Sequence, residues 1–408
     1  MSILGGLPIA QPRVVVSGNF ATPRRALALF DETVESYRVF ALNAQDLPRS
    51  RADVVMETPF VGAGMRDSAT LEYLPMRLSL VPRLFLRWRP PDVVVLNTST
   101  PRGGKVSLGI EVNILPAAIA AARRRGGLVI AQLNRHMPYT RGDGEIELDA
   151  IDLAIEADDP LLTCTPAAIA EHDMAIGARV SALVEDGATL QLGIGRIPDS
   201  VLLSLGQHRE LGIWSEMISD GVLNLERSGV LATDRPITAS FLFGSPELYE
   251  WVDDNERLRL LCTETVNDPA RIARNGQMTS INTAMQFDLF GQANASYAHG
   301  RIYSGLGGQP DFVEGSLHSQ GGHSVIALRS WHDKSQSSTI VPALSTPATS
   351  FQHSMVVTEN GWAEIFGRSQ KAQVRLLIEE TARPDARDSL WEAARKLQLA
   401  YPTAPDDG

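Results

Sequence analysis

One carboxylate in an apolar stretch is the residue of this chain best suited to covalent chemistry. Glu216 stands at the end of a strand-like run, and its neighbours are apolar: Trp214, Met217 and Ile218. Apolar surroundings disfavour the charged form of a carboxyl group, which is typical of a reactive group rather than a solvated one. The alternative for an isolated glutamate at a strand end is a helix cap, so Glu216 needs partners before it can be assigned to catalysis.

Two glycine-rich turns supply backbone groups that could serve such a carboxylate. GIGRIP at residues 193–198 resembles half of a dinucleotide-binding fingerprint, but the third glycine is missing, so it does not predict a dinucleotide. Its successive N–H groups at a strand-to-helix turn suit an anion or a developing oxyanion. SGLGGQPDF at residues 304–312 has three glycines in four positions, which allows close backbone approach to a ligand and favours a functional loop.

Alternating strands and helices must position these turns. Runs rich in β-branched residues at 13–17, 93–97 and 127–134 are separated by helix-like segments, which indicates a parallel sheet covered on both faces. Ligands of such sheets collect at the carboxyl ends of strands, here the loops with Gly18, residues 97–102 and residues 134–143. The last loop contains His136 and Arg141, but its Pro, Gly and Asp residues are explained equally well by turn formation.

The length of 408 residues favours two domains. A polar, proline-bearing passage at residues 156–166 and a helix-like segment lead to a strand near residue 189, after which the alternation resumes. We therefore predict an α/β fold with an N-terminal domain of residues 1–185 and a C-terminal domain of residues 186–408 that carries Glu216.

Composition excludes several classes of function. A formal net charge of −11 argues against a nucleic-acid surface. Cys164 and Cys262 are far apart and have no metal-ligand spacing, and neither HExxH nor an ordered Ser-His-Asp set is present, so no metal is expected. The first residues lack the charged and apolar regions typical of a signal peptide, and no run approaches the roughly 18 apolar residues of a membrane span, so we expect neither. We expect a cytoplasmic protein without membrane contact that forms a homodimer.

Taken together, these stretches resemble the acetyl-CoA hydrolase/transferase family, in the subgroup of 4-hydroxybutyrate and succinyl-CoA:acetate CoA-transferases. The resemblance runs through nearly the whole chain. It is carried by LQLGIGRIPDSVL, SEMISDGVLNL, VNDP and SGLGGQPDF, with support from GNFATP, MPYTRGD and TENGWAEIFG. It implies two related open α/β domains of the CoA-transferase type, with the active site between them.

The resemblance also implies roles for individual residues. Glu216 matches the family's nucleophilic glutamate, which forms an acyl-glutamyl anhydride and then a glutamyl-CoA thioester. The N–H groups of Ile194 and Gly308 match the oxyanion donors, and Asn267 and Glu359 match further active-site positions. The implied coenzyme A path comprises Gln191, Leu192, Gly193, Ile194, Gly195, Ser304, Gly305, Gly307, Gly308 and Lys334. Coenzyme A is then a substrate, and no tightly bound cofactor is expected.

Some positions depart from the family pattern. Ser215 replaces the threonine often found before the glutamate and keeps a hydroxyl group. Ile365, Phe366 and Gly367 stand where Leu-Arg-Gly is usual, so an arginine is missing. These changes bear on the acyl group accepted more than on the class of reaction.

Three functions follow as hypotheses from these residues. The leading one is a CoA-transferase acting between an acyl-CoA and a carboxylic acid of the acetate, butyrate, 4-hydroxybutyrate or succinate type. The second is an acyl-CoA hydrolase that uses the same glutamate with water as acceptor. The third is a CoA-binding protein without turnover, while a sugar-phosphate isomerase on a similar frame would leave Glu216 and both glycine turns unexplained.

Overall fold

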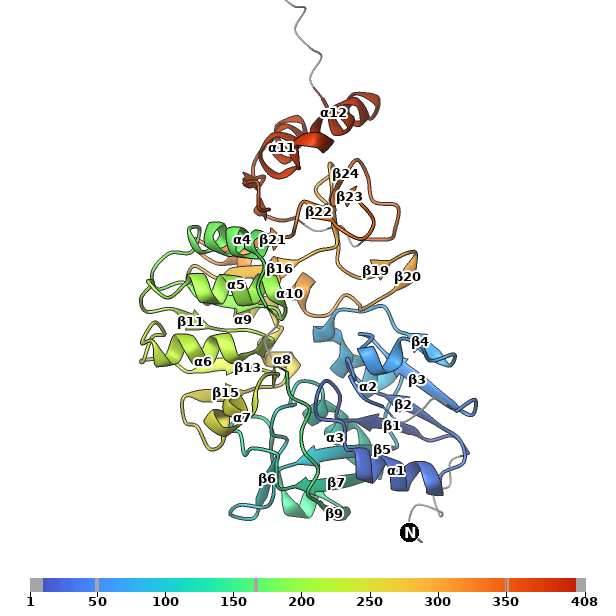
Figure 1. The fold of residues 1–408 in the computed structure, drawn as a ribbon. Helices are drawn as coiled ribbons and strands as arrows, with labels where there is room; N and C mark the ends of the chain where they lie inside the picture. The colour runs from blue at the N-terminus through green and yellow to red at the C-terminus, as the bar shows by residue number, and fades with distance from the viewer. Residues whose placement is uncertain (1–9, 48–50, 165–167, 349, 351, 401–408) are drawn as a thin grey trace, which may run out of the picture.

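Two open α/β units make up the fold in the computed structural model, which describes residues 10–47, 51–164, 168–348, 350 and 352–400 (Figure 1). The first unit is a seven-stranded sheet in the order β4-β3-β2-β1-β5-β7-β9, and every pairing in it is parallel. Its strands are β1 (Arg13–Val16), β2 (Tyr37–Phe40), β3 (Val54–Thr58), β4 (Leu71–Tyr73), β5 (Val93–Thr98), β7 (Leu128–Asn134) and β9 (Leu153–Ala157). The predicted parallel α/β sheet is confirmed.

Helices α1 (Arg24–Thr33), α2 (Val81–Arg87) and α3 (Leu115–Arg123) cover this sheet. Prolines in the first turns of α2 and α3 favour helix starts there, because proline fixes φ near its helical value. Helix α3 buries Leu115, Ala118, Ile119 and Ala122, a spacing that keeps one apolar stripe against the core. All six residues of β5 are buried, as expected for a strand with helices on both faces.

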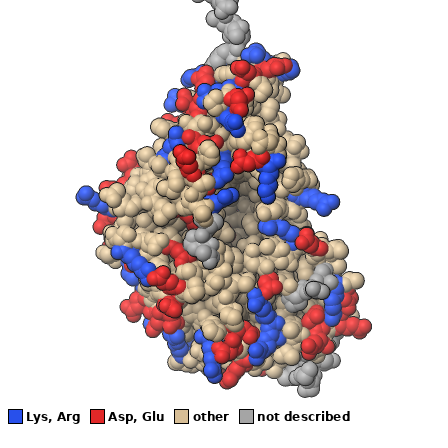
Figure 2. Space-filling view, in the orientation of Figure 1, with Lys and Arg blue, Asp and Glu red and all other residues tan. Residues whose placement is uncertain are grey.

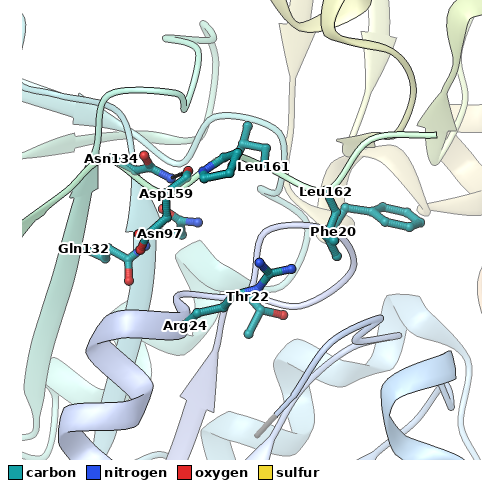
Figure 3. Close-up of a pocket in the computed structure, with 10 residues that line it drawn as sticks. Phe20, Thr22, Arg24, Asn97, Gln132, Asn134, Asp159, Leu161 and Leu162 are labelled. Carbon is teal, nitrogen blue, oxygen red and sulfur yellow. Dashed lines mark hydrogen bonds between the residues drawn. The ribbon is translucent and has the colours of Figure 1, made fainter. Parts of the chain in front are cut away.

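The strand order reverses direction between β1 and β5, where such sheets usually bind ligands. A small pocket at these strand ends is lined by Asn97, Gln132 and Asn134, with Thr22 and Arg24 at the start of α1 (Figure 3). The side-chain oxygen Oε1 of Gln132 accepts hydrogen bonds from the backbone N–H groups of Arg25 and Ala26, at 3.0 and 3.1 Å. Gln132 therefore serves mainly to hold the start of α1 on the sheet.

The second unit is a six-stranded sheet in the order β11-β10-β16-β21-β25-β26, parallel except for β26. Its strands are β10 (Thr189–Leu192), β11 (Gly212–Ile213), β16 (Thr279–Thr283), β21 (His323–Ala327), β25 (Met355–Val357) and β26 (Trp362–Glu364). Helices α4 (Glu171–Ser181), α5 (Arg196–Ser204) and α10 (Gln309–His318) pack against it. The predicted strand-turn-helix at residues 190–204 is thus present as β10 and α5.

Short parallel pairs join the two units. They are β12 (Met217–Ile218) with β14 (Phe241–Leu242), and β13 (Ile237–Ala239) with β15 (Leu258–Leu260). The N–H of Leu242 donates to the Ile110 carbonyl at 2.9 Å, and the N–H of Asp143 donates to the Leu260 carbonyl at 2.9 Å. One apolar cluster continues from the first unit, with Val94, to the second, with Leu190 and Val325. The domain boundary near residue 185 remains a prediction.

The C-terminal segment packs around its own apolar cluster at one end of the second sheet. It contains β17 (Gln286–Asp288), β18 (Ala293–Asn294) and β24 (Ile340–Val341). Helix α11 (Gln370–Leu376) continues into a π-helical turn at Leu377–Thr381, and α12 (Arg387–Lys396) follows. Strands β17 and β18 pair antiparallel, and α12 buries Leu390 and Ala394 in this cluster.

Candidate active site

Glu216 lies between β11 and β12, at the junction of the two units. Its carbonyl oxygen accepts hydrogen bonds from the backbone N–H groups of Ser240 and Phe241, at 2.9 and 3.1 Å. These bonds fix the backbone, and the residue as a whole is half-buried. A held backbone fixes the place from which the carboxylate of a nucleophile can attack.

Asn267 is the side-chain partner of Glu216. Its Nδ2 donates to Glu216 Oε2 at 3.0 Å, and the side chain is fully buried. Asn267 follows α8 (Thr263–Val266), and the Trp214 indole N–H donates to the Val266 carbonyl at 3.0 Å. The end of α8 is thereby held against the segment that carries the glutamate.

Gly308 completes the cluster from a distant part of the sequence. Its backbone N–H lies close enough to the Glu216 carboxyl group to favour the charged form. A Cβ atom on Gly308 would lie 1.8 Å from Glu216 Oε2 and 2.3 Å from Asn267 Nδ2. Position 308 therefore has to be glycine for these groups to meet.

The loop that carries Gly308 is anchored on the first unit. The Val61 N–H donates to the Ser304 carbonyl at 2.8 Å, and the Leu78 N–H donates to the Gly307 carbonyl at 2.9 Å. Gly305 also forms an isolated bridge with Phe60. The first unit thus holds the loop that meets Glu216, and the site lies between the units.

The carboxyl group of Glu216 is a weaker acid than that of an ordinary glutamate. Burial raises its pKa to about 7, and the nearby charge of Asp311 adds to this effect, while the hydrogen bonds from Asn267 and Gly308 act in the opposite direction. Asp311 lies in the first turn of α10 and accepts hydrogen bonds from the Ser79 N–H and Oγ, at 3.3 and 2.8 Å. Burial raises the pKa of Asp311 to about 7 as well.

Glu111 is a third carboxyl group at this place, and sequence reasoning missed it together with Asp311. The residue is buried, and its backbone forms an isolated β-bridge with Phe241. Its Oε2 accepts a hydrogen bond from Asn19 Nδ2 at 2.6 Å. Burial raises its pKa to about 8, and the charge of Glu216 contributes. The signal was available, because Glu111 stands between Ile110 and Val112 in an apolar run like that around Glu216.

An open cavity of about 880 Å³ borders the start of α5. Ile194, Gly195 and Lys334 line it, and its other basic side chains are Arg196, His299, Arg329 and His332, beside the carboxylates of Asp173 and Asp333. Figure 2 shows Lys and Arg side chains around a hollow on this face. In a protein with a net charge of −11, such a gathering of basic groups suits an anionic ligand.

A buried ion pair supports this wall of the cavity. Asp173 accepts hydrogen bonds from Arg329 Nε and from a terminal guanidinium nitrogen, both at 2.6 Å. By contrast, Lys334 has no carboxylate within ion-pair distance among the described residues. A cation without a counter-ion at the cavity wall is suited to a phosphate group.

Other residues predicted to lie in the site have structural contacts. Gln191 Oε1 accepts from Ser280 Oγ at 2.7 Å, and Leu192 is buried in the sheet. Glu359 accepts from the N–H and Oγ of Ser330, at 2.9 and 2.5 Å. Glu216, Asn267 and Gly308 are therefore brought together, whereas Glu359 is engaged at a separate loop.

Comparisons with known proteins identify the family of the chain. Models of the acetyl-CoA hydrolase/transferase N-terminal and C-terminal domains match residues 4–165 and 244–394. The chain is also 39% identical to the 4-hydroxybutyrate coenzyme A transferase of Clostridium kluyveri, over 83% of this chain and 81% of that protein. The chain belongs to the acetyl-CoA hydrolase/transferase family. It is accordingly an enzyme with CoA-transferase activity.

Solved structures related to the acetyl-CoA hydrolase/transferase family share the whole fold. RipA from Yersinia pestis aligns with a TM-score of 0.88 at 28% identity, covering 98% of this chain and 96% of that one. The 4-hydroxybutyrate CoA-transferase of Porphyromonas gingivalis aligns with a TM-score of 0.80 at 30% identity, covering 97% and 96%. No helix in the described part of the chain has the length and apolar character needed to cross a bilayer.

Proposed function

We propose that the enzyme moves coenzyme A between an acyl-CoA and a carboxylic acid through covalent intermediates on Glu216. The observation that carries this proposal is the cluster of Glu216, Asn267 and Gly308, three residues of the C-terminal half that meet where the first unit anchors the Gly308 loop. The acids named for relatives, such as 4-hydroxybutyrate, define the range of substrates to test.

The proposed reaction has two halves. An oxygen of Glu216 attacks the thioester carbonyl carbon, the C–S bond breaks, and coenzyme A leaves as thiolate. The thiolate then attacks the Glu216 carbonyl carbon of the anhydride, which releases the first carboxylate and leaves a glutamyl-CoA thioester. An acceptor carboxylate then attacks the glutamyl-CoA thioester, and the same steps run in reverse. The free energy of the original thioester is conserved in each covalent intermediate.

The residues around Glu216 have separate roles in this proposal. The N–H of Gly308, with that of Ile194, stabilises the oxyanion of each tetrahedral intermediate. Asn267 orients the carboxylate through the hydrogen bond of 3.0 Å. Coenzyme A would occupy the basic cavity beside Ile194, Gly195 and Lys334.

A hydrolase is the second candidate, because the family includes acetyl-CoA hydrolases. The two are separated by incubating the protein with short acyl-CoAs, with and without acetate, butyrate, 4-hydroxybutyrate or succinate. A transferase gives a new acyl-CoA only when the acceptor is present. Release of free coenzyme A without an acceptor would favour the hydrolase, and binding without turnover would favour a CoA-binding protein.

The raised pKa of Glu216 predicts an acidic limb in the rate profile. The attacking group must be ionised, so kcat/KM for acyl-CoA should fall about tenfold per pH unit below about pH 7. Removing the negative charge in Asp311→Asn should lower the pKa of Glu216 and move this limb to lower pH. Initial rates measured from pH 5 to 9 test this, and a limb that stays in place in Asp311→Asn would contradict the assigned coupling.

Lys334 gives a prediction for coenzyme A binding. Lys334→Ala should raise KM for acyl-CoA roughly five- to tenfold with little change in kcat, since an exposed charge-assisted contact contributes about 1 kcal/mol. Lys396→Ala on α12, where Lys396 pairs with Glu392, is the matched control. An equal effect of the two substitutions would remove Lys334 from the binding site.

The homodimer and the cytoplasmic location stay predictions. Size-exclusion chromatography with light scattering measures the first directly, and fractionation of the source cells measures the second.

A further inference from the structure

Four buried polar atoms near Glu216 make no hydrogen bond of normal geometry: Glu111 Oε1, Asn113 Nδ2, Thr263 Oγ1 and Asn267 Oδ1. The Asn113 amide is also close enough to the Glu111 carboxyl group to favour its charged form. Buried polar atoms in folded proteins are nearly always paired, because an unpaired one costs about 1–3 kcal/mol. Several such atoms in one place therefore indicate a site that a ligand completes.

Backbone hydrogen bonds connect the segments that carry these atoms. The Thr263 N–H donates to the Asn113 carbonyl and the Asn267 N–H donates to the Thr263 carbonyl, each at 3.0 Å. The Asn113 N–H donates to the Ser240 carbonyl at 3.3 Å, and the Ser240 N–H donates to the Glu216 carbonyl at 2.9 Å. The four residues are thus gathered around the proposed nucleophile, at the junction of the two units.

One oxygen of Glu111 accepts a well-formed hydrogen bond, whereas the other makes none of normal geometry, although the Asn113 amide and the Gly18 N–H act on the carboxyl group. Asn43 Nδ2 donates to Asn19 Oδ1 at 2.8 Å, and Asn19 Nδ2 donates to Glu111 Oε2 at 2.6 Å. Burial raises the pKa of the carboxyl group, so it is protonated at neutral pH and has an O–H to donate.

The chemistry of the unpaired atoms defines the ligand. The amide of Asn113, the hydroxyl of Thr263 and a protonated Glu111 all donate hydrogen bonds, and these are the groups that a carboxylate accepts. A fixed positive charge would hold a carboxylate more tightly but would also stabilise the ionised Glu111. Neutral donors bind the acid weakly enough for it to leave after each turnover.

We propose that Glu111, Asn113 and Thr263 form the subsite that binds the carboxylate group of the acid substrate beside Glu216. This inference rests on the proposed function, and it assigns the recognition of the acid to residues other than those that bind coenzyme A. The same donors then face the acyl carbonyl oxygen once the acid has become an acyl group.

The first test is Thr263→Val, which removes the hydroxyl and preserves the shape of the side chain. We expect KM for acetate or 4-hydroxybutyrate to rise about tenfold, with KM for acyl-CoA changing less than twofold. The melting temperature should not fall, because the hydroxyl has no partner in the free protein and a methyl group replaces it. Thr265→Val, two residues along the same helix and outside the subsite, is the matched control.

Two outcomes of this test would overturn the subsite. One is an unchanged KM for the carboxylate, as expected if these atoms hold only an ordered water. The other is a lower melting temperature with both KM values raised, as expected if the hydroxyl has only a structural role.

The second test uses the pH dependence of carboxylate binding in Glu111→Gln. In the wild-type protein, KM for the acceptor should rise as the pH passes about 8, where Glu111 ionises and repels the acid. Glutamine keeps a neutral donor, so this rise should disappear. The charge of Glu216 acts on Glu111, and the charge of Asp311 acts on Glu216. Glu216 carries no charge when the acceptor enters, because it is then covalently bound to coenzyme A. An identical alkaline rise in the variant would contradict the assignment to Glu111.

Failure of the subsite can be distinguished from failure of the proposed function. Incubation with acyl-CoA alone should load Glu216 with coenzyme A in the wild-type protein and in Thr263→Val. Discharge of this adduct by acetate should need about ten times more acetate in the variant. No adduct in the wild-type protein would end the proposed function, whereas equal discharge of both proteins would end only the subsite.

Discussion

Glu216→Ala is expected to lower kcat/KM for CoA transfer at least ~10⁴-fold, because it removes the carboxylate that we propose forms the acyl-enzyme bond. The cavity that would hold coenzyme A lies beside other residues, so binding of acyl-CoA should persist. Stopped assays of acyl exchange together with calorimetric titration of the variant with acyl-CoA measure both quantities.

The matched control for this substitution is Glu250→Ala, at an exposed position on α7 (Pro246–Val252). It should retain the activity of the wild-type protein. If Glu216→Ala kept activity within tenfold of the wild-type protein, Glu216 could not be the nucleophile, and the raised pKa would need another explanation.

Gly308→Ala is the second large effect, with an expected loss of about 10²–10³-fold in kcat, the usual result of removing one oxyanion donor. The added methyl group would overlap Glu216 Oε2 and the Asn267 amide, so the loop or the carboxylate must move. Because coenzyme A contacts would remain, KM for acyl-CoA should change much less than kcat.

Gly276→Ala is the control for Gly308→Ala. Gly276 has no heavy atom within 4 Å of the place where its Cβ would be, so it tests the same chemical change without a clash. Gly276→Ala should leave kcat within twofold. Equal activity of the two variants would mean that Gly308 does not contact the carboxylate during turnover.

Much of this architecture follows from local sequence. The β-branched runs at residues 13–17 and 93–97 became adjacent parallel strands, because such residues suit a strand buried on both faces. The strand, glycine turn and helix at residues 190–204 also appeared as predicted. These features depend on periodicity and turn residues, which a sequence displays directly.

The composition of the site was harder to predict. Glu216, Asn267 and Gly308 followed from resemblance to a family, and the structure brings them together. Glu111 and Asp311 were missed because their proximity to Glu216 depends on how the two units dock, which no local pattern encodes. Glu359 follows β25, and its carboxylate accepts hydrogen bonds from Ser330 rather than joining the Glu216 cluster.

The most direct test of the account is to locate the covalent intermediate. The protein is incubated with acetyl-CoA, treated with borohydride, digested, and examined by mass spectrometry, with Glu216→Gln as the control. We predict that borohydride reduces Glu216 to the alcohol in the wild-type peptide only. If acetate or 4-hydroxybutyrate is added first, in the absence of free coenzyme A, the acid discharges the adduct and Glu216 should stay unreduced. An unmodified Glu216 in a protein that turns over acyl-CoA, or modification at a different residue, would contradict the proposed mechanism.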